Sequence, residues 1–423
     1  MNLFEELQWR GVIYDATEGI QEVIAREKLT GYIGFDPSAS SLHVGSLLQI
    51  MNLARLQRYG HSPIAVVGGG TGLIGDPSGK TKERQLLTKE QVEENQSGIR
   101  EQLSRFLDFE TKTNPARIVN NYDWLGSISY IDFLREVGKY FTVNAMLAKE
   151  SVKRRIESED GITFTEFSYM LLQAYDFLVL YDRFHCTLQM GGSDQWGNIV
   201  AGADLIRRLR SAKAYGIVSP LVTSSMGVKF GKTEAGAVWL DAQWTSPYRF
   251  YQYWLNTEDA DAIQYLKYFT WLSETEIAAL ETALREKPEN REAQRALARE
   301  ITRMTHGQTA LQSVERASQV LFGGEMEGLR AAEVQDIFQD VPSSAVEKSR
   351  LQGDGLPLVE LLALTGLLPS KGEARRMIQQ GGVYLNNRPV AEAQKTVSLA
   401  DSIDGQFLVL RKGRKNYHLV KIV

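Results

Sequence analysis

Apolar runs separated by polar turns predict a parallel α/β sheet in the first half of the chain. Residues 32–35 form a short apolar strand that ends before Pro37, and the period that follows predicts a helix over 42–58. Continuous apolar runs of this kind are typical of strands that are covered on both faces. Further strands of the same sheet are predicted near residues 63–67, 117–120 and 186–190.

The pattern becomes helical from Thr245 to about Gly323 and mixed in the tail. Gly and Pro clusters mark loose connections between these parts. In the tail, the pattern predicts helices over 358–364 and 371–379 and strands near 383–385, 406–410 and 416–422. We therefore predict a parallel-sheet domain at 1–222, a lysine loop with a helical domain at 223–322, a linker at 323–352 and a small α+β domain at 353–423.

Composition supports an ordinary globular protein of more than one domain. The chain has 423 residues, of which 24% are charged and 43% hydrophobic, and it is too long for one compact core. The single cysteine, Cys186, excludes an internal disulfide and disfavours a thiolate metal site. The opening residues lack the pattern of an export signal, and no uncharged stretch has the length of a membrane span. We expect a cytoplasmic protein without a membrane partner.

Charge is distributed unevenly along the chain. The net charge is −4, but residues 351–423 carry ten Lys and Arg against six Asp and Glu. A basic tail on an acidic body indicates a polyanion bound at one end of the protein. Arg375 and Arg376 on the second predicted tail helix are candidates for this contact. The alternative is a tail surface that happens to be basic and binds nothing.

Several polar residues fall where strands give way to loops or helices. His43 and Gly45 lie in the first turn of the predicted helix, where free backbone N–H groups and the helix dipole favour a phosphate. Asp76 and Asn121 follow later strands, at the sheet edge where open α/β sheets bind ligands. Asp194 follows two glycines, and it is either a helix cap or a ligand of a ribose hydroxyl.

A polar stripe runs along the predicted helix over 163–177. Tyr169, Gln173 and Asp176 are spaced at i, i+4 and i+7, which puts them on one face. Burying Asp176 without a partner would be costly. The stripe therefore either makes hydrogen bonds inside the core or lines a small polar pocket.

A Gly- and Ser-rich loop at 224–236 carries Lys229 and Lys232. Such a loop is expected to be mobile. Two ammonium groups at this spacing suit a triphosphate, because they would neutralise the charge that grows as pyrophosphate leaves. Many solvated loops have a similar composition, so the motif is unspecific when taken alone.

Together these motifs resemble a known family. The His-Val-Gly-Ser run at 43–46 and the Lys-Phe-Gly-Lys-Thr run at 229–233 resemble the paired signatures of class I aminoacyl-tRNA synthetases. Residues 72–80, 167–177 and 191–198 are similar to the tyrosyl branch of that family, and the tail resembles its S4 RNA-binding module. The first signature usually ends in a second histidine, where this chain has Ser46. Serine can hydrogen-bond but cannot offer a cationic imidazole to phosphate.

The resemblance implies a Rossmann-like catalytic domain, an α-helical domain and an S4-type module in a homodimer. It further implies an enzyme that activates tyrosine with ATP and Mg²⁺ and then charges tRNA(Tyr), with no tightly bound protein metal. The implied tyrosine-binding residues are Tyr32, Asp76, Asn121, Tyr169, Gln173, Asp176 and Gln195. The implied ATP-binding residues are Gly34, Asp36, Ser38, His43, Gly45, Ser46, Gly192, Asp194 and Lys232.

Carried over to this chain, the family's catalytic and RNA-binding roles fall on further residues. Tyr32 and Asp176 would bind the phenol of tyrosine, and Asp76, Tyr169 and Gln173 its ammonium group. The implied catalytic residues are His43, Lys229, Lys232 and Thr233. The implied tRNA-binding residues are Lys80, Arg84, Lys371, Arg375, Arg376 and Arg388.

Two other classes of protein share part of this pattern. A small-molecule nucleotidylyltransferase would share the His-x-Gly turn but would need neither an amino-acid pocket nor a second lysine loop. A non-catalytic RNA-binding protein on the same scaffold is compatible with Ser46. Tyrosine-dependent exchange of pyrophosphate into ATP separates all three.

Overall fold

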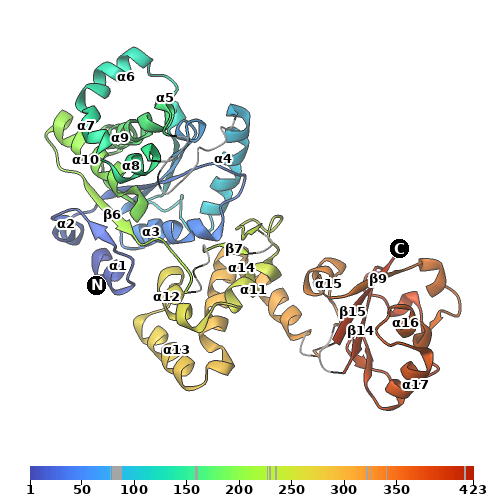
Figure 1. Cartoon of the computed structure of the whole chain (residues 1–423). Helices are drawn as coiled ribbons and strands as arrows, with labels where there is room; N and C mark the ends of the chain where they lie inside the picture. Colours follow the sequence, from blue (N-terminus) through green and yellow to red (C-terminus); the bar gives the residue numbers. More distant parts are fainter. Residues whose placement is uncertain are drawn as a thin grey trace. The chain divides into compact units, whose positions relative to one another are not determined.

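The computed structural model of the chain describes residues 1–76, 78, 88–157, 161–225, 227, 230–233, 236–320, 323–324, 326–339, 341–413 and 416–423 (Figure 1). For residues 89, 150, 151, 232 and 233 it describes the backbone only. The chain divides into two compact units. The first consists of residues 1–245 and 254–305, and the second of residues 246–253 and 306–423.

The first unit is built on a mostly parallel sheet. Its strands are β1 (Asp15–Ala16), β2 (Thr30–Phe35), β3 (Ser62–Val67), β4 (Arg117–Asn120), β5 (Cys186–Gly192) and β6 (Tyr215–Ser219). Within the described residues the order across the sheet is β1-β6-β5-β2-β3-β4. Only the short β1 is antiparallel to its neighbour. The predicted parallel α/β fold is confirmed.

Helices cover both faces of this sheet. They are α1 (Leu3–Trp9), α2 (Ile20–Arg26), α3 (Leu47–Arg58), α4 (Lys89–Leu103), α5 (Tyr122–Leu125), α6 (Tyr130–Glu136), α7 (Val143–Leu147), α8 (Glu150–Ile156), α9 (Phe164–Phe184) and α10 (Trp196–Arg210). In Figure 1, α9 and α10 lie on one side of the strands and α3 on the other. A Cβ at Gly202 would lie 2.9 Å from the Phe177 ring, so only glycine lets α10 pack so closely on α9.

The chain after β6 is largely helical. Two short strands, β7 (Lys232–Thr233) and β8 (Gly236–Ala237), precede α11 (Pro247–Leu255), α12 (Asp259–Phe269), α13 (Glu274–Glu286) and α14 (Glu292–Val320). Gly307 interrupts α14 with a φ of 86°, a backbone conformation that glycine adopts readily. Within the first unit, α12 packs against α3, so part of the helical region belongs to the same compact body as the sheet.

The tail of the second unit is a small α+β module. Its elements are α15 (Ala331–Ile337), β9 (Ser343–Val346), β10 (Leu356–Pro357), α16 (Leu358–Leu364), α17 (Lys371–Gln379), β11 (Val383–Leu385), β12 (Arg388–Pro389), β13 (Thr396–Val397), β14 (Phe407–Lys412) and β15 (Asn416–Ile422). The two predicted helices have the predicted bounds. The segment 323–352, for which we predict a linker, supplies α15 and β9, and β9 pairs in parallel with β15.

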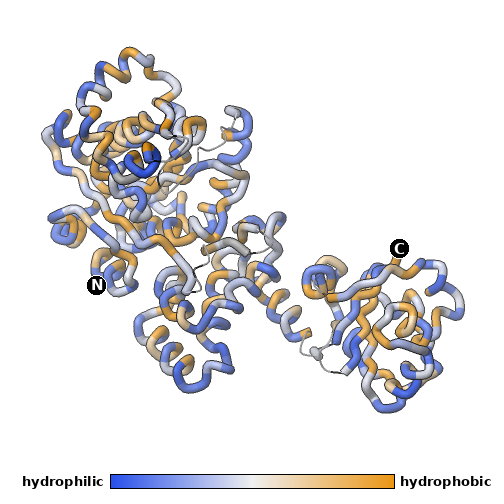
Figure 2. The backbone as a smooth tube through the Cα atoms, in the orientation of Figure 1, coloured by the Kyte–Doolittle hydropathy of each residue, from blue (hydrophilic) through white to orange (hydrophobic). Residues whose placement is uncertain are grey.

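Hydrophobic residues are concentrated inside each unit. Figure 2 shows the hydrophobic colours in the central strands and blue stretches along α4 and α13. One apolar cluster lies between the sheet and α9 and α10, and a second fills the tail module beneath α16 and α17. Within the described residues, no helix combines the length and apolar composition that a membrane crossing requires.

A buried ion pair joins α8 to the start of α9. The Arg155 Nη2 and Nε atoms donate to Glu166 at 2.8 and 3.2 Å, and the two side chains are only 2% and 4% exposed. Glu166 also completes the N-terminal cap of α9 with Thr163. The pair therefore fixes the beginning of the helix that carries the polar stripe.

We expect Arg155→Met to lower the free energy of unfolding by about 3–5 kcal/mol, because it leaves the Glu166 carboxylate buried without its cation. The double variant Arg155→Met/Glu166→Leu should recover most of this loss. Urea unfolding followed by circular dichroism at one protein concentration measures both. Arg303→Met, which breaks a more exposed pair with Glu300, is the control and should cost less than about 1 kcal/mol. Equal losses for the two arginines would contradict the prediction.

Candidate active site

A pocket of about 340 Å³ opens at the carboxyl ends of β2 and β5. The chain runs from β2 outward to β3 and from β5 outward to β6, so the strand order reverses between these neighbours. Ligands of open α/β sheets bind at such a reversal. The pocket is lined by every residue implied for tyrosine or ATP, apart from Lys232: Tyr32, Gly34, Asp36, Ser38, His43, Gly45, Ser46, Asp76, Asn121, Tyr169, Gln173, Asp176, Gly192, Asp194 and Gln195.

The turn at His43 differs from the prediction. His43 is the N-cap of a 3-10 turn over Val44–Ser46, and the α-helix begins only at Leu47. The Gly45 N–H donates to the His43 Nδ1 at 2.9 Å, the Val44 N–H to the carbonyl of Val238, and the Ser46 N–H to that of His43. The predicted free N–H groups of this turn are therefore already used.

Gly45 is required by the way the His43 ring folds back. A Cβ at Gly45 would lie 2.5 Å from the His43 Cε1 atom. Because the Nδ1 atom accepts the Gly45 N–H, a neutral His43 carries its proton on Nε2. His43 is exposed at the pocket, so the imidazole rather than the backbone is the donor that this turn offers to an anion.

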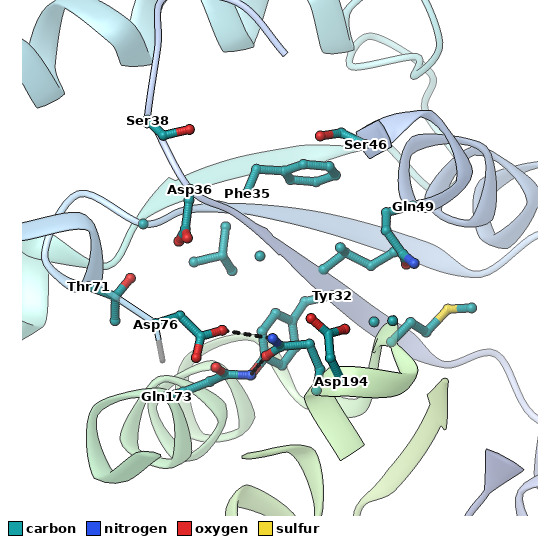
Figure 3. Close-up of a pocket in the computed structure, with 18 of the residues that line it drawn as sticks. Tyr32, Phe35, Asp36, Ser38, Ser46, Gln49, Thr71, Asp76, Gln173 and Asp194 are labelled. Carbon is teal, nitrogen blue, oxygen red and sulfur yellow. Dashed lines mark hydrogen bonds between the residues drawn. The ribbon is translucent and has the colours of Figure 1, made fainter. Parts of the chain in front are cut away.

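Tyr32 lies deep in the pocket (Figure 3). Its hydroxyl is buried and has no hydrogen-bond partner among the described residues. Burial raises the pKa of Tyr32 well above its usual value, and the nearby Asp176 carboxylate raises it further. The ring packs edge-on against Phe177, with centroids 5.3 Å apart. A buried hydroxyl without a partner needs a polar group from a ligand or water.

Asp176 is held by two donors from the segment after β4. The Trp124 indole N–H donates to one carboxylate oxygen at 2.7 Å, and the Asn121 side-chain amide donates to the other at 2.9 Å. Burial raises the pKa of Asp176 to about 7, although both hydrogen bonds lower it. Sequence reasoning missed Trp124, since nothing in the chain pattern indicates that its indole reaches α9.

A second carboxylate, Asp76, anchors a chain of side-chain amides. Gln195 donates to Asp76 at 2.7 Å, Gln173 donates to Gln195 at 3.2 Å, and Asn198 donates to Gln173 at 3.2 Å. Figure 3 shows Asp76 and Gln173 beside Tyr32, each with a dashed line that marks its hydrogen bond. Among the described residues Asp76 has no cationic partner. Two further carboxylates, those of Asp36 and Asp194, also line the pocket. This end of the pocket suits a ligand cation.

Tyr169 belongs to the same end of the pocket. Burial raises its pKa well above the usual value, and the carboxylates of Asp76, Asp36 and Asp176 raise it further, while a hydrogen bond with Thr71 lowers it. Tyr169 therefore stays protonated near neutral pH and keeps a hydroxyl that can donate or accept. With Gln173 and Asp176 it forms the polar stripe, and all three face the pocket.

Asp194 lies on a 3-10 turn over Ser193–Gln195 before α10. The N-cap residue of this turn is Gly192, and that of α10 is Gln195. Asp194 therefore does not occupy the N-cap position that we considered for it. A Cβ at Gly192 would lie 2.6 Å from an Asp194 carboxylate oxygen. Glycine at 192 therefore leaves the space that the carboxylate occupies.

Gln49, on α3, was not predicted as a site residue. Its amide nitrogen donates to the Ser219 hydroxyl at 2.7 Å, and Ser219 donates in turn to the carbonyl of Gly191. The Gln49 amide oxygen is buried and has no partner among the described residues. Figure 3 places Gln49 and Ser46 at the end of the pocket nearest the start of α3.

Other predicted residues lie away from the pocket or outside the described residues. Lys80, Arg84 and Lys229 fall outside the described residues, and for Lys232 and Thr233 only the backbone of β7 is described. No group of His, Cys, Asp or Glu suited to a metal ion occurs in the part of the chain that the structure covers.

The predicted basic residues of the tail differ in their partners. Lys371 binds Glu360 at 2.7 Å, and Arg388 binds the exposed Glu327 at 2.9 Å. Arg375 and Arg376 on α17 are exposed and form no ion pair with the residues described here. These two guanidinium groups are therefore available to a polyanion.

A parallel sheet that reverses at a polar pocket, with the two signature runs at 43–46 and 229–233, defines a class I synthetase catalytic domain. The family model for class I tRNA synthetases, W and Y, matches residues 25–323, and the chain belongs to this family. The model of the tyrosine–tRNA ligase SYY-like C-terminal domain matches residues 333–420. The match assigns both the catalytic region and the tail to known domains.

Whole proteins of the tyrosine branch resemble the chain over its full length. A tyrosine–tRNA ligase of Roseiflexus castenholzii is 57% identical, covering 100% of this chain and 99% of that protein. The tyrosine–tRNA ligase of Geobacillus stearothermophilus is 53% identical, covering 100% of both. The crystal structure of a C-terminally truncated Aspergillus nidulans mitochondrial tyrosyl-tRNA synthetase has a TM-score of 0.69 at 30% identity, covering 76% of this chain and 94% of that one.

The raised pKa of Asp176 predicts a pH dependence of stability. In the unfolded chain an aspartate ionises near pH 4. Between about pH 4 and pH 7 the folded protein therefore keeps a proton on Asp176 that the unfolded chain has lost. The contribution of Asp176 to the free energy of unfolding should fall as pH rises through this window, by up to about 1.4 kcal/mol per pH unit, and level off above pH 7.

Urea unfolding of the wild type and of Asp176→Asn at pH 5, 6, 7 and 8 measures this contribution, because the difference between the two proteins cancels all other titrating groups. We expect the variant to gain on the wild type from pH 5 to 7 and to gain little more from pH 7 to 8, because a group with a pKa of about 7 is already half ionised at pH 7. A difference that is the same at all four pH values would show that Asp176 ionises near its ordinary pKa in the folded protein.

Proposed function

We propose that this protein is a tyrosine–tRNA ligase. It activates tyrosine with ATP to give tyrosyl-adenylate and pyrophosphate, and then transfers the tyrosyl group to the 3′-terminal ribose of tRNA(Tyr). Membership of the class I family and identities of 51–57% to tyrosine–tRNA ligases over the full chain support this function. The single structural observation that carries it is the buried Tyr32 hydroxyl beside the Asp176 carboxylate.

Tyr32 and Asp176 would recognise the phenol of the substrate. A phenol that enters between them donates its proton to the Asp176 carboxylate and accepts from the Tyr32 hydroxyl. Phenylalanine would leave the Tyr32 hydroxyl buried without a partner and would offer Asp176 no hydrogen bond from a phenol, and an unsatisfied buried polar group costs about 1–3 kcal/mol. Trp124 and Asn121 each donate to one of its oxygens and so keep the carboxylate in place.

The opposite end of the amino acid would meet Asp76, Tyr169 and Gln173. The Asp76 carboxylate offsets the charge of the substrate ammonium, while Tyr169 and Gln173 accept its remaining N–H groups. Gln195 donates to Asp76 and so fixes the carboxylate that receives the ammonium. The spacing of Tyr169 and Asp176 by two helical turns lets one helix hold both ends of a single tyrosine.

ATP would occupy the end of the pocket near the start of α3. His43 and Ser46 face its phosphates and ribose from one side, and Asp194 faces the ribose hydroxyls from the other. Gly34, Gly45 and Gly192 leave room for the nucleotide, and Asp36 and Ser38 border the same space. Mg²⁺ enters with ATP as part of the substrate.

The chemical step needs position and charge stabilisation and no side-chain nucleophile. The tyrosine carboxylate attacks the α-phosphorus, the bond to the bridging oxygen breaks, and pyrophosphate leaves with its electron pair. His43 donates from Nε2 to the phosphate oxygens as negative charge grows. Lys229, Lys232 and Thr233 would neutralise the departing pyrophosphate, and Lys80 and Arg84 would bind tRNA.

A homodimer is supported by an exposed apolar surface on the first unit. Large hydrophobic side chains lie exposed on α6 to α9: Tyr130, Ile131, Leu134, Val143, Leu147, Ile156 and Phe164. Phe164 is 67% exposed and Ile131 69%. These side chains all fall within residues 130–164, and exposed hydrophobic surface is typical of protein interfaces. We propose that a second copy of the chain covers it.

The function predicts tyrosine-dependent exchange of labelled pyrophosphate into ATP, with no exchange when phenylalanine replaces tyrosine. Asp176→Asn should weaken tyrosine binding about ten- to a hundredfold, because the phenol loses its charged acceptor. Asp182→Asn is the control, since Asp182 lies on the same helix but pairs with Arg210 at the surface. Exchange that does not depend on tyrosine would reject the function, and intact selectivity in Asp176→Asn would reject the phenol site.

The tail predicts a separable contribution to tRNA binding. The variant Arg375→Ala/Arg376→Ala should bind tRNA more weakly and reduce the slope of log affinity against log salt by about 2, because two phosphate contacts are lost. Adenylate formation should be unchanged. Arg350→Ala removes a positive charge that already pairs with Glu360, so it should have a smaller effect. Filter binding across a salt series measures the slope, and an unchanged slope would show that α17 does not contact tRNA.

A further inference from the structure

Helix α12 presents one stripe of side chains to the segment that precedes and enters the lysine loop. Asp261, Tyr265 and Phe269 are four residues apart, which places them on one face of the helix. They are 6%, 4% and 0% exposed. This buried stripe offers a hydrogen-bond acceptor, a hydroxyl and an apolar ring to the segment that packs against it.

The first two members of the stripe hold the chain where it leaves the sheet. The Asp261 carboxylate accepts the Ser225 backbone N–H at 3.1 and 3.0 Å and the Ser225 hydroxyl at 3.0 Å. The Tyr265 hydroxyl donates to the carbonyl of Thr223 at 3.2 Å. A charge-assisted contact with backbone and side chain together fixes both the position and the orientation of this segment.

The third contact lies inside the Lys-Phe-Gly-Lys-Thr signature. The Phe230 ring stacks on Phe269 with centroids 5.4 Å apart and an interplanar angle of 6°. It also meets Tyr265 edge-on at 5.2 Å and Trp254 at 5.8 Å. Phe230 is 8% exposed, although the signature that contains it is otherwise polar. The residue that directly follows Lys229 is therefore an anchor buried among aromatic rings.

From this anchor the chain turns directly onto the His43 turn. Gly231 has a φ of 80°, and a Cβ there would lie 2.9 Å from the Val44 Cγ2 atom and 3.3 Å from the Gly45 nitrogen. The Gly231 carbonyl accepts the Val238 N–H at 3.0 Å, and the Val238 carbonyl accepts the Val44 N–H at 2.9 Å. The two signature segments are thus joined by backbone contacts next to the pocket.

Helix α12 is itself fixed to the sheet at its C-terminal end. The guanidinium of Arg55, from α3, donates to the carbonyl of Tyr268 at 2.7 Å, and that of Arg10 donates to the carbonyls of Lys267 and Leu272 at 2.9 Å. Cations at a helix C-terminus satisfy carbonyls that lack partners and oppose the negative end of the dipole. Helix α12 therefore contacts both α3, which follows the His43 turn, and the described residues of the lysine loop.

We propose that Asp261, Tyr265, Phe269 and Phe230 are positioning residues for adenylate formation. They do not touch substrate; they hold the segments on either side of Lys229 and before Lys232 at fixed places relative to His43. This role rests on the proposed function, in which the two lysines stabilise the leaving pyrophosphate. Loss of the anchor then lowers the rate of the chemical step and leaves tyrosine binding unchanged, because no residue of α12 is among the described residues that line the pocket.

The test compares Phe230→Ala and Asp261→Ala with Gln264→Ala, which alters an exposed residue of the same helix. Single-turnover adenylate formation should slow about ten- to a hundredfold in the first two variants, since small displacements of charged groups cost rate on that scale. The tyrosine dissociation constant should stay within about twofold of wild type. Phe230→Met, which keeps an apolar side chain, should recover most of the rate.

A second measurement excludes general damage to the fold. In a variant lacking both loop lysines, Lys229→Ala/Lys232→Ala, the added change Phe230→Ala should slow adenylate formation little further, because the groups that Phe230 positions are absent. Unchanged rates in Phe230→Ala and Asp261→Ala, a parallel loss of tyrosine affinity, or a full additional loss in the lysine-free background would each overturn the proposal. Failure of the wild type to exchange pyrophosphate would instead reject the function itself, so the two failures are distinguishable.

Discussion

The pocket depends on Asp176, a buried carboxylate that pairs with no cation among the described residues. Asp176 lies beneath the point where the strand order reverses, and Trp124 and Asn121 supply the hydrogen bonds that make burial tolerable. Burial raises the pKa of Asp176 to about 7. This arrangement requires the segment after β4 to lie against α9, and it therefore requires the whole order of the sheet. The selectivity for a phenol that we propose would in this sense be a property of the topology.

Much of the pocket could be predicted from the sequence because strand ends and helical spacing are local patterns. The period of Tyr169, Gln173 and Asp176 is enough to place them on one face, and parallel strands bring Asp76 and Asn121 to one edge. Contacts between distant segments were not accessible in this way. The indole of Trp124 reaches Asp176, and the amide of Gln49 reaches the pocket, through packing that no local pattern specifies.

The turn at His43 shows where a local rule fails. A helix start usually leaves N–H groups free, but here β-like pairing with Val238 and the fold of the imidazole onto Gly45 use them. The division of the chain is a similar case. The helical pattern is visible in the sequence, but α12 is attached to α3 through Arg55 and to the end of α1 through Arg10, two arginines far away in the chain.

The chain of amides that ends at Asp76 has a direction. Asn198 donates to Gln173, Gln173 to Gln195, and Gln195 to Asp76, which as a carboxylate can only accept. If the last member were a carboxamide, the whole chain could reverse with the same number of hydrogen bonds. One charge at the edge of the sheet thus selects one of two otherwise equal orientations for three neutral side chains.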